Sequence, residues 1–364
     1  MRNCIASVLL TSFSMLLLSM LAGAARGATP AWYPVVVDVW DPPFNTLRQR
    51  SQQTYTPLEQ ASGSWNICVA IPHLKDAYWL AVNYGLIAEA RRLGVGLSLY
   101  EAGGYEHLAV QREQIEQCLE DGFDGLIISA IAQHGFDDLL QRAVDDGIPV
   151  LDLINGMAST NISARVAVDF WDAGALAGGF IRQRHANDDA VVHVAWFPGP
   201  DGAAWVAAGD AGFRHAIADS NVEIIATRYG DTGRLTQSQL IEEVLAQDSV
   251  EVDYVVGTAV TADAASDVLR KHGLADRVEV LAYYYSSGVH NGLRRGNIVA
   301  APSDQQALQA RLAVDVMVRM LEKRDYLKHV APRPVLIDSS SLRQWDSSTT
   351  LAPRGFRPIF SVNN

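Results

Sequence analysis

Groups of aromatic residues are the feature of this sequence that most directly suggests chemistry. They stand where apolar, strand-like runs end, and the main groups are Tyr78-Trp79, Tyr105, Phe170-Trp171, Trp196 with Trp205, and Tyr283-Tyr284-Tyr285. Any one group is more often core or hinge packing than ligand contact. Several groups at equivalent positions favour a ring-lined cleft, because aromatic faces attract alkylated ammonium groups by about 0.5–2 kcal/mol each. Since few Arg or Asn residues accompany the rings, the pattern suits a compact, cation-like ligand better than a sugar.

Catalytic and cofactor-binding motifs are absent from the sequence. There is no G-x-S-x-G elbow, P-loop or H-E-x-x-H motif, and the first strand-to-helix turn reads Pro72-His73-Leu74-Lys75-Asp76 rather than G-x-G-x-x-G. The nine His residues are scattered singly, and no Cys/His spacing suits a metal. The stretch 198–202 is interpreted as a plain strand-to-helix turn rather than a phosphate cradle. We therefore expect a binding protein without enzymatic activity, cofactor or metal.

The first 28 residues read as a secretory signal. One Arg precedes an apolar stretch over about 5–21, and the small residues of 22–28 follow. The alternative is a membrane anchor, although the stretch is barely long enough to span and contains polar Thr11, Ser12 and Ser14. The formal net charge of -12 argues against nucleic acid as a partner. We expect export to the periplasm with cleavage of the signal peptide.

Two cysteines remain once Cys4 leaves with the signal peptide. In an oxidising compartment, Cys68 and Cys118 could form a disulfide. Both also lie in apolar surroundings, Cys68 in a strand and Cys118 on the buried face of a helix, where free cysteines act as small hydrophobic residues. The sequence leaves the two alternatives open.

Strand and helix patterns alternate from residue 65 onward. Continuous apolar runs such as 66–71 and 148–153 are typical of strands buried on both faces, and the segments between such runs have helical spacing. The alternation restarts after Asp169 and continues to about residue 295. It predicts an α/β fold of two doubly wound, Rossmann-like parallel-sheet domains with right-handed crossovers. In such sheets ligands bind beyond the carboxyl ends of the strands.

The segments after residue 296 have no third core to join. Strand 297–301, helix 303–322 and strand 334–337 are therefore expected to return to the two domains, and the resulting chain crossings form a hinge. The predicted organisation is a signal peptide (1–28), an N-terminal extension whose role stays open (29–64), an N-terminal domain (65–168 plus 300–326), a C-terminal domain (169–299 plus 327–340) and a tail (341–364).

Several motifs resemble the type I periplasmic binding proteins, the ribose-binding protein class. The chain is similar in particular to members that sense trimethylamine N-oxide (TMAO) for a membrane histidine kinase. The resemblance runs from about residue 65 to 360. Its most specific blocks are Pro72-His73-Leu74-Lys75-Asp76-Ala77-Tyr78-Trp79-Leu80 and Glu101-Ala102-Gly103-Gly104-Tyr105, with further matches at 198–201, 257–259, 292–296, 303–305 and 355–358.

The resemblance implies a ligand site made of an aromatic cage. By motif position the cage consists of Trp79, Tyr105 and Tyr284, with Asp76 as polar partner. A further cage Trp falls at Phe170, so either Phe170 replaces that ring or Trp171 enters the site instead.

The implied ligand is TMAO and the implied partner is the periplasmic sensor domain of a membrane histidine kinase. The alternative is the substrate-binding component of an ABC transporter for a sugar or a quaternary amine. A repressor of the same fold would need a helix-turn-helix domain before Trp65, where 29–64 is too Pro-rich and aperiodic to form one.

Overall fold

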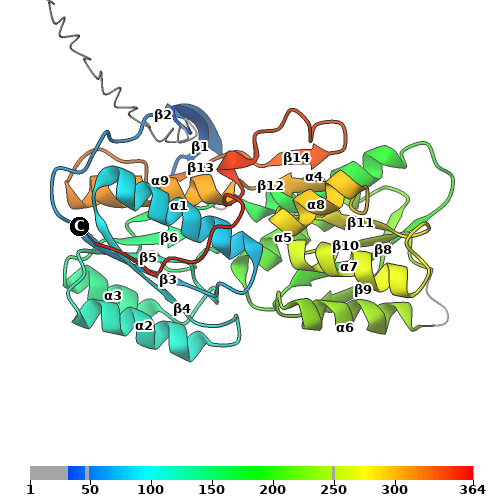
Figure 1. The fold of residues 1–364 in the computed structure, drawn as a ribbon, viewed down its shortest axis with the longest axis horizontal. Coiled ribbons are helices and arrows are strands. Elements are labelled where there is room, and N and C mark those ends of the chain that lie inside the picture. The colour runs from blue at the N-terminus through cyan, green and yellow to red at the C-terminus, as the bar shows by residue number, and fades with distance from the viewer. Residues whose placement is uncertain (1–31, 46–48, 248–250, 364) are drawn as a thin grey trace, which may run out of the picture. The chain divides into compact units, whose positions relative to one another are not determined.

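The computed structural model describes residues 32–45, 49–247 and 251–363 (Figure 1). The predicted signal peptide lies outside these ranges, so its cleavage stays a prediction. No helix within the described ranges is long and apolar enough to cross a membrane.

The first lobe is built on a parallel sheet in the order β4-β3-β5-β6-β7. Its central strands are apolar and almost fully buried, because helices cover both faces of the sheet. The strands are β3 (Asn66–Ile71), β4 (Gly96–Glu101), β5 (Gly125–Ile128), β6 (Val150–Leu153) and β7 (Ala164–Val166), and the helices between them are α1 (Ala77–Leu93), α2 (Leu108–Glu120) and α3 (Asp137–Asp145).

The second lobe is built on a separate sheet in the order β14-β12-β11-β10-β8-β9, in which only β14 runs antiparallel. The strands are β8 (Val192–Gly199), β9 (Val222–Tyr229), β10 (Tyr254–Gly257), β11 (Glu279–Ala282), β12 (Ala300–Ser303) and β14 (Val335–Asp338). The helices are α4 (Phe170–Arg184), α5 (Ala204–Ile217), α6 (Arg234–Leu245), α7 (Ala259–Lys271) and α8 (Ser287–Arg295). The predicted fold class, with two doubly wound sheets, is confirmed.

Two of the predicted domain boundaries differ from the structure. Strand β12, assigned from sequence to the N-terminal domain, pairs with β11 in the second lobe, while the helix that follows it, α9 (Gln306–Leu321), packs on α1 in the first lobe. Strand β13 (His329–Ala331), assigned to the C-terminal domain, pairs with β7 in the first lobe. An apolar pattern shows that a segment is buried, but it does not show with which strand, and therefore in which sheet, the segment pairs.

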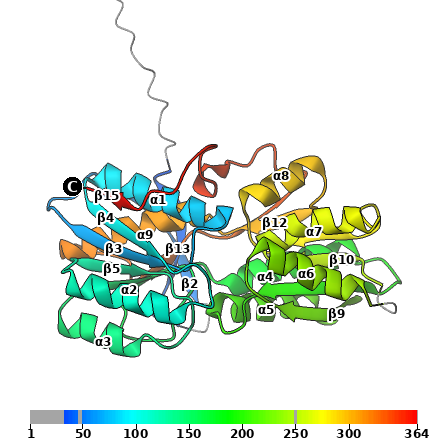
Figure 2. The same ribbon diagram turned by 60° about the horizontal axis from the view of Figure 1, so that its bottom comes forward.

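Both ends of the described chain complete the first lobe. Strands β1 (Val35–Trp40) and β2 (Arg50–Tyr55) form an antiparallel hairpin that joins the sheet beside β13. At the opposite edge, β15 (Ser361–Val362) pairs with β4, after the tail has passed a short 3-10 helix, Ser347–Thr349 (Figure 2). The segments predicted as an extension and a tail are therefore edge strands of this sheet, which the polar sequence of β2 does not reveal.

A buried charge network fixes the N-terminal segment to α1 and α9. Arg311 lies 2.6 Å from Glu89, and the Arg311 guanidinium stands 3.9 Å from the centre of the Trp32 ring. The Tyr55 hydroxyl donates to the carboxylate of Asp315 at 2.6 Å. Because removing one partner of a buried ion pair leaves an uncompensated charge, these contacts hold the hairpin firmly on the first lobe.

Cys68 in β3 and Cys118 in α2 form a disulfide in the structure, with their Cα atoms 6.1 Å apart. This Cα separation is in the usual range for a disulfide. The bond ties β3 of the first-lobe sheet to helix α2, which packs on it.

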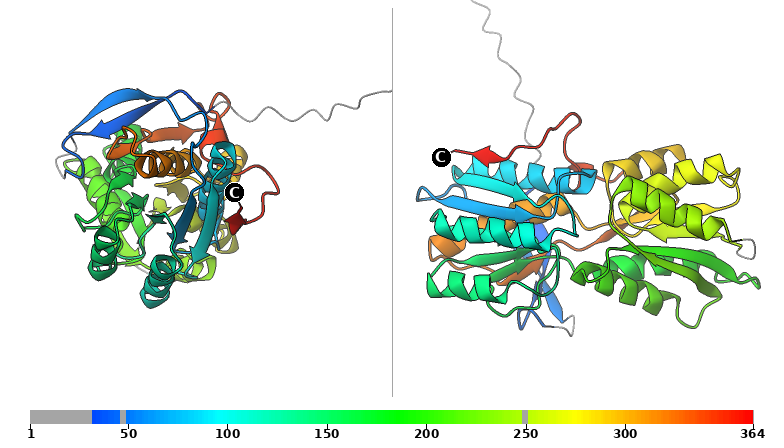
Figure 3. Two further views of the ribbon diagram at one scale, coloured as in Figure 1. Left: turned by 90° about the vertical axis from the view of Figure 1, so that its left-hand side faces the viewer. Right: turned by 90° about the horizontal axis from the view of Figure 1, so that it is seen from below.

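The chain passes between the lobes at 166–170, 303–306 and 331–335, and again in the tail (Figure 3). These passages form the predicted hinge. The loops that follow β3, β4 and β6 in the first lobe, and β8, β9 and β11 in the second, supply the walls of the site described next.

Candidate functional site: an aromatic pocket between the lobes

The start of α1 places two rings by backbone capping. Asp76 is the N-cap residue, and its Oδ1 accepts hydrogen bonds from the backbone N–H groups of Tyr78 at 3.0 Å and Trp79 at 3.1 Å. This is the preferred role of Asp before a helix. The Tyr78 hydroxyl then donates to buried Asp304 at 2.6 Å, so the Tyr78 ring is fixed at both ends.

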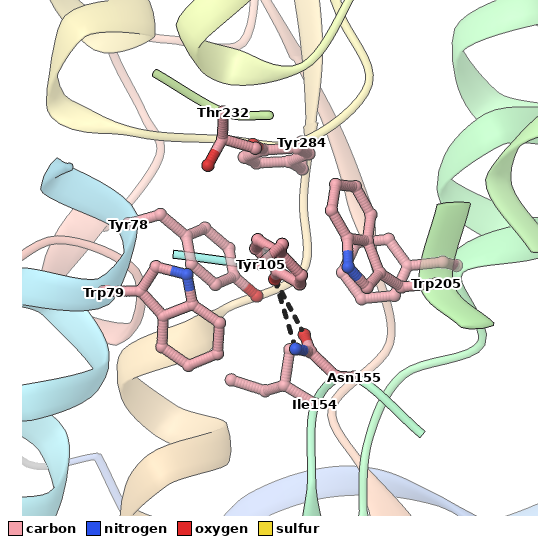
Figure 4. Close-up of a pocket in the computed structure, with 9 residues that line it drawn as sticks. Tyr78, Trp79, Tyr105, Ile154, Asn155, Trp205, Thr232 and Tyr284 are labelled. Carbon is pink, nitrogen blue, oxygen red and sulfur yellow. Dashed lines mark hydrogen bonds between the residues drawn. The ribbon is translucent and has the colours of Figure 1, made fainter. Parts of the chain in front are cut away.

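The remaining first-lobe wall comes from the loops after β4 and β6. Asn155 donates one amide hydrogen to the Tyr105 hydroxyl at 3.1 Å and the other to the carbonyl of Ala130 at 2.8 Å. Its neighbour Ile154 has a φ of 65°, a left-handed conformation that is unusual for a β-branched residue. Such outliers cluster at binding sites, and here the turn directs both side chains toward the pocket (Figure 4).

The second lobe contributes three rings. Phe170 begins α4, Trp205 lies in the first turn of α5, and Tyr284 follows β11. The position of the Trp205 ring requires glycine at residue 199. A Cβ at that residue would stand 2.8 Å from the Trp205 ring, and Gly199 has a φ of 121°. The stretch 198–202 is thus a strand-to-helix turn that makes room for Trp205.

These residues enclose one small cavity, called the aromatic pocket below (Figure 4). The empty space between them is about 250 Å³ when the part open to solvent is counted, and it is lined by Tyr78, Trp79, Tyr105, Ile154, Asn155, Phe170, Trp205, Thr232 and Tyr284. Ring centres lie 5.2 Å apart for Tyr78 and Tyr284 and 5.6 Å apart for Phe170 and Trp205. Rings from both lobes therefore surround the cavity at contact distance.

Among the described residues, no charged side chain lines the aromatic pocket. Its polar groups are the Asn155 amide, the Thr232 hydroxyl, the Tyr hydroxyls and the Trp indole nitrogens. Thr232 lies 3.1 Å from Nε2 of His73, and burial lowers the pKa of His73 to about 3, which keeps it neutral at pH 7. Burial also raises the pKa of Tyr105, so its hydroxyl keeps its proton. The site can hold an alkylated nitrogen by ring faces and a polar atom by neutral donors.

Asp76 stands beside the aromatic pocket rather than in its wall. It lines a second, polar cavity of about 860 Å³ together with Lys75, Arg234 and Asp263, and this cavity shares Tyr78, Thr232 and Tyr284 with the aromatic pocket. Burial raises the pKa of Asp76 to about 6, against the opposing effect of the two N–H groups that it caps. The structure therefore gives Asp76 the role of positioning the first turn of α1.

Of the other predicted site residues, Trp79, Tyr105, Phe170 and Tyr284 meet at the aromatic pocket and Trp171 does not. The Trp171 ring packs against His215 at 5.1 Å, and its backbone carbonyl lies where a Cβ on Gly212 would clash. Consecutive helical residues point about 100° apart, so only one of Phe170 and Trp171 can face the cavity.

Sequence reasoning missed Tyr78, Ile154, Asn155, Trp205 and Thr232 as pocket residues. The aromatic grouping already contained Tyr78 and Trp205, each in the first turn of a helix that follows a strand. Ile154, Asn155 and Thr232 stand in loops whose sequences show no distinguishing pattern.

Residues 67–325 match the family described as the periplasmic binding protein domain. The chain belongs to this family. It is 35% identical over 309 residues to the periplasmic protein TorT of Escherichia coli strain K12. The aligned region covers 85% of this chain and 87% of TorT. The predicted resemblance is confirmed.

Solved structures of periplasmic binding proteins are similar over most of the chain. An ABC transporter solute-binding protein from Bradyrhizobium sp. BTAi1 with bound bis-tris is 44% identical, with a TM-score of 0.79, and covers 90% of this chain and 98% of that one. TorT in complex with the TorS sensor domain in the presence of TMAO is 30% identical, with a TM-score of 0.74, over 82% of this chain and 100% of that one. Periplasmic binding proteins bind ligands rather than catalyse reactions, and the family assigns this chain to the periplasm.

Proposed function

We propose that this protein is a periplasmic sensor that encloses TMAO in the aromatic pocket and signals to the sensor domain of a membrane histidine kinase. The observation that carries the proposal is a small pocket between the lobes whose walls are rings from both of them. The similarity to TorT, and to TorT bound to the TorS sensor domain in the presence of TMAO, supports both the ligand and the partner.

The chemistry of the pocket suits TMAO. The ligand is neutral overall, with a positive nitrogen covered by methyl groups and a negative oxygen. Its methyl groups can contact ring faces, since each desolvated contact of this kind stabilises by about 2 kcal/mol. A sugar would need a polar partner for each hydroxyl, and the lining offers few besides Asn155 and Thr232.

Signalling follows from the position of the pocket between the lobes. A ligand that contacts both lobes binds the closed form more tightly than the open form, and it shifts the population by that difference in affinity. Closure changes the surface that both lobes offer together to a partner. The kinase sensor domain would then distinguish the ligand-bound closed form.

A second candidate is the substrate-binding component of an ABC transporter. The 44% identity to the Bradyrhizobium solute-binding protein over 90% of this chain favours it. That protein was solved with bound bis-tris. The ligand of this candidate would be a sugar or a quaternary amine. The two candidates differ in the partner that recognises the closed protein.

Calorimetry with TMAO, choline, betaine and ribose tests the ligand. We expect TMAO to bind, ribose not to bind, and Trp79→Ala to weaken TMAO at least about tenfold, or ~1.4 kcal/mol. An unchanged affinity in Trp79→Ala would mean that the rings at these strand ends serve packing only.

Reconstitution tests the partner. Adding TMAO to the protein and the sensor domain of the cognate kinase should change kinase output. If deletion of the gene instead abolishes uptake of a solute and leaves every TMAO-dependent transcript unchanged, the transporter candidate is correct.

A further inference from the structure

A buried hydrogen-bond donor in the wall of the aromatic pocket has no well-placed acceptor. The indole Nε1–H of Trp205 is buried and makes no hydrogen bond of normal length and angle in the described parts of the chain, where the Tyr105 hydroxyl is only a weak acceptor for it. The whole residue is only 5% exposed. A buried donor left unpaired costs about 1–3 kcal/mol, so its presence in a binding pocket points to a ligand acceptor.

Most hydroxyl and amide groups around the pocket are engaged by other residues. Tyr78 donates to Asp304, and both amide hydrogens of Asn155 are used, by the Tyr105 hydroxyl and the Ala130 carbonyl. The Thr232 hydroxyl pairs with His73. The Tyr105 hydroxyl accepts from Asn155 and has the Asn155 Oδ1 at 3.5 Å as a distant acceptor for its own proton.

The ring of Trp205 also forms part of the wall of the aromatic pocket. The Trp205 ring centre lies 5.6 Å from Phe170, 5.7 Å from Tyr284 and 6.0 Å from Tyr105. In Figure 4 the indole nitrogen faces the interior between Tyr105 and Asn155. The residue thus offers an aromatic surface and a neutral donor to one enclosed space.

We propose that the Trp205 Nε1–H donates a hydrogen bond to the oxygen of the bound N-oxide, and that this contact makes the pocket select N-oxides over oxygen-free alkylammonium ions. The inference rests on the proposed function, since it names the group that recognises the ligand oxygen. The oxygen of an N-oxide carries a full negative charge, so the bond is of the stronger, charge-assisted kind. Tetramethylammonium has the same cationic, methylated surface and lacks an acceptor, so the ring faces would hold it without using this donor.

Replacing Trp205 by Phe removes the N–H and keeps an aromatic ring. Calorimetry on the full mature chain with TMAO and with tetramethylammonium should show a loss of TMAO affinity of about tenfold or more in Trp205→Phe, with tetramethylammonium affinity changed by no more than about twofold. Equal losses for both ligands would mean that Trp205 acts only through packing and would overturn the inference, as would unchanged TMAO affinity.

Three control variants locate the donor. Trp79→Phe removes another indole N–H of the same pocket, and Tyr105→Phe and Tyr284→Phe remove hydroxyls. Each should change the two affinities in parallel, because under the proposal none of these three polar groups contacts the ligand oxygen. A selective loss of TMAO affinity in any of them, with none in Trp205→Phe, would assign the oxygen to that residue instead.

A measurement on the unmodified protein covers the case in which Trp205→Phe does not fold. The indole proton resonance of Trp205 should move downfield on addition of TMAO and stay in place on addition of tetramethylammonium. If this resonance does not move on addition of TMAO although calorimetry shows TMAO binding, the inference is overturned and the proposed function remains intact. If the unmodified protein binds no TMAO at all, the proposed function and this inference both fail.

Discussion

The ammonium group of Lys75 lies 2.6 Å from the carboxylate of Asp231, and the two residues belong to different lobes. Lys75 is in the loop after β3, and Asp231 is in the loop between β9 and α6. Two residues before Lys75, His73 contacts Thr232 of the same opposing loop at 3.1 Å. This pair of contacts closes the cleft beside the aromatic pocket, so the loops after β3 and β9 hold the lobes together.

Removing the ion pair should favour the open form. Both side chains are partly exposed, which limits the pair to about 1 kcal/mol at most. In Lys75→Ala we therefore expect TMAO affinity to fall by no more than about fivefold, with a larger radius of gyration for the unliganded protein in small-angle X-ray scattering.

Lys271→Ala is the matched control for Lys75→Ala, since Lys271 pairs with Glu242 inside the second lobe at 2.7 Å. It should leave the affinity and the scattering curve unchanged. Identical behaviour of the two variants would show that the contact across the cleft does not influence closure.

Asp76 should make the stability of the protein depend on pH. Burial raises its pKa to about 6, above the value of 3.8 for an unperturbed Asp. The folded state therefore holds the proton more tightly, so the stabilising contribution of Asp76 is complete below about pH 4 and is lost as pH rises through about 6.

The variant Asp76→Asn keeps a capping side chain and cannot ionise. Its free energy of unfolding relative to the parent should rise by up to about 3 kcal/mol between pH 4 and pH 7.5, measured by denaturant titration. A difference that stays constant over this range would mean that Asp76 titrates normally. Asp304, whose pKa burial also raises to about 6, is present in both proteins and cancels in the comparison.

The alternation of strands and helices could be predicted because most of the parallel strands are apolar runs buried on both faces. Strand β3, with five of its residues buried, and the cap at Asp76 leave clear local signals. The membership of β12 and β13 could not be predicted, since these short strands are buried wherever they pair. Strand β2 is polar, with four consecutive exposed residues, and its pairing with β1 leaves no periodic signal.

The rings of the aromatic pocket could be predicted from the sequence only in part. Tyr105 and Tyr284 lie in the loops after strands, and Trp79 lies in the first turn of the helix after β3, where parallel sheets place ligands. Asp76 was expected as a polar partner of the ligand, but an Asp that precedes a helix serves equally as its cap, and sequence alone cannot separate the two roles. Trp205 reaches the pocket only because Gly199 leaves room for its ring, which is a tertiary contact.

The disulfide should contribute to stability and not to ligand binding. It links positions 50 residues apart in the sequence, and closing a loop of this length in the unfolded chain stabilises by about 2–4 kcal/mol. The double variant Cys68→Ala/Cys118→Ala should lose that amount in denaturant titration, while its TMAO affinity stays the same. If reductant leaves the unfolding midpoint of the parent protein unchanged, the two thiols are not bonded in solution.

Phe170 and Trp171 should respond differently to replacement by Ala. Phe170 lines the aromatic pocket and is 4% exposed, with its ring 5.6 Å from that of Trp205. Loss of its ring face should weaken TMAO by about fivefold or more, corresponding to roughly 1 kcal/mol.

The Trp171 ring instead packs against His215, 5.1 Å away on α5. Trp171→Ala should therefore lower the melting temperature and leave TMAO affinity within about twofold of the parent. Calorimetry and thermal melts on the two variants, measured side by side, separate these effects. The reverse order, with Trp171→Ala losing affinity and Phe170→Ala keeping it, would require α4 to turn so that Trp171 enters the pocket when the ligand binds.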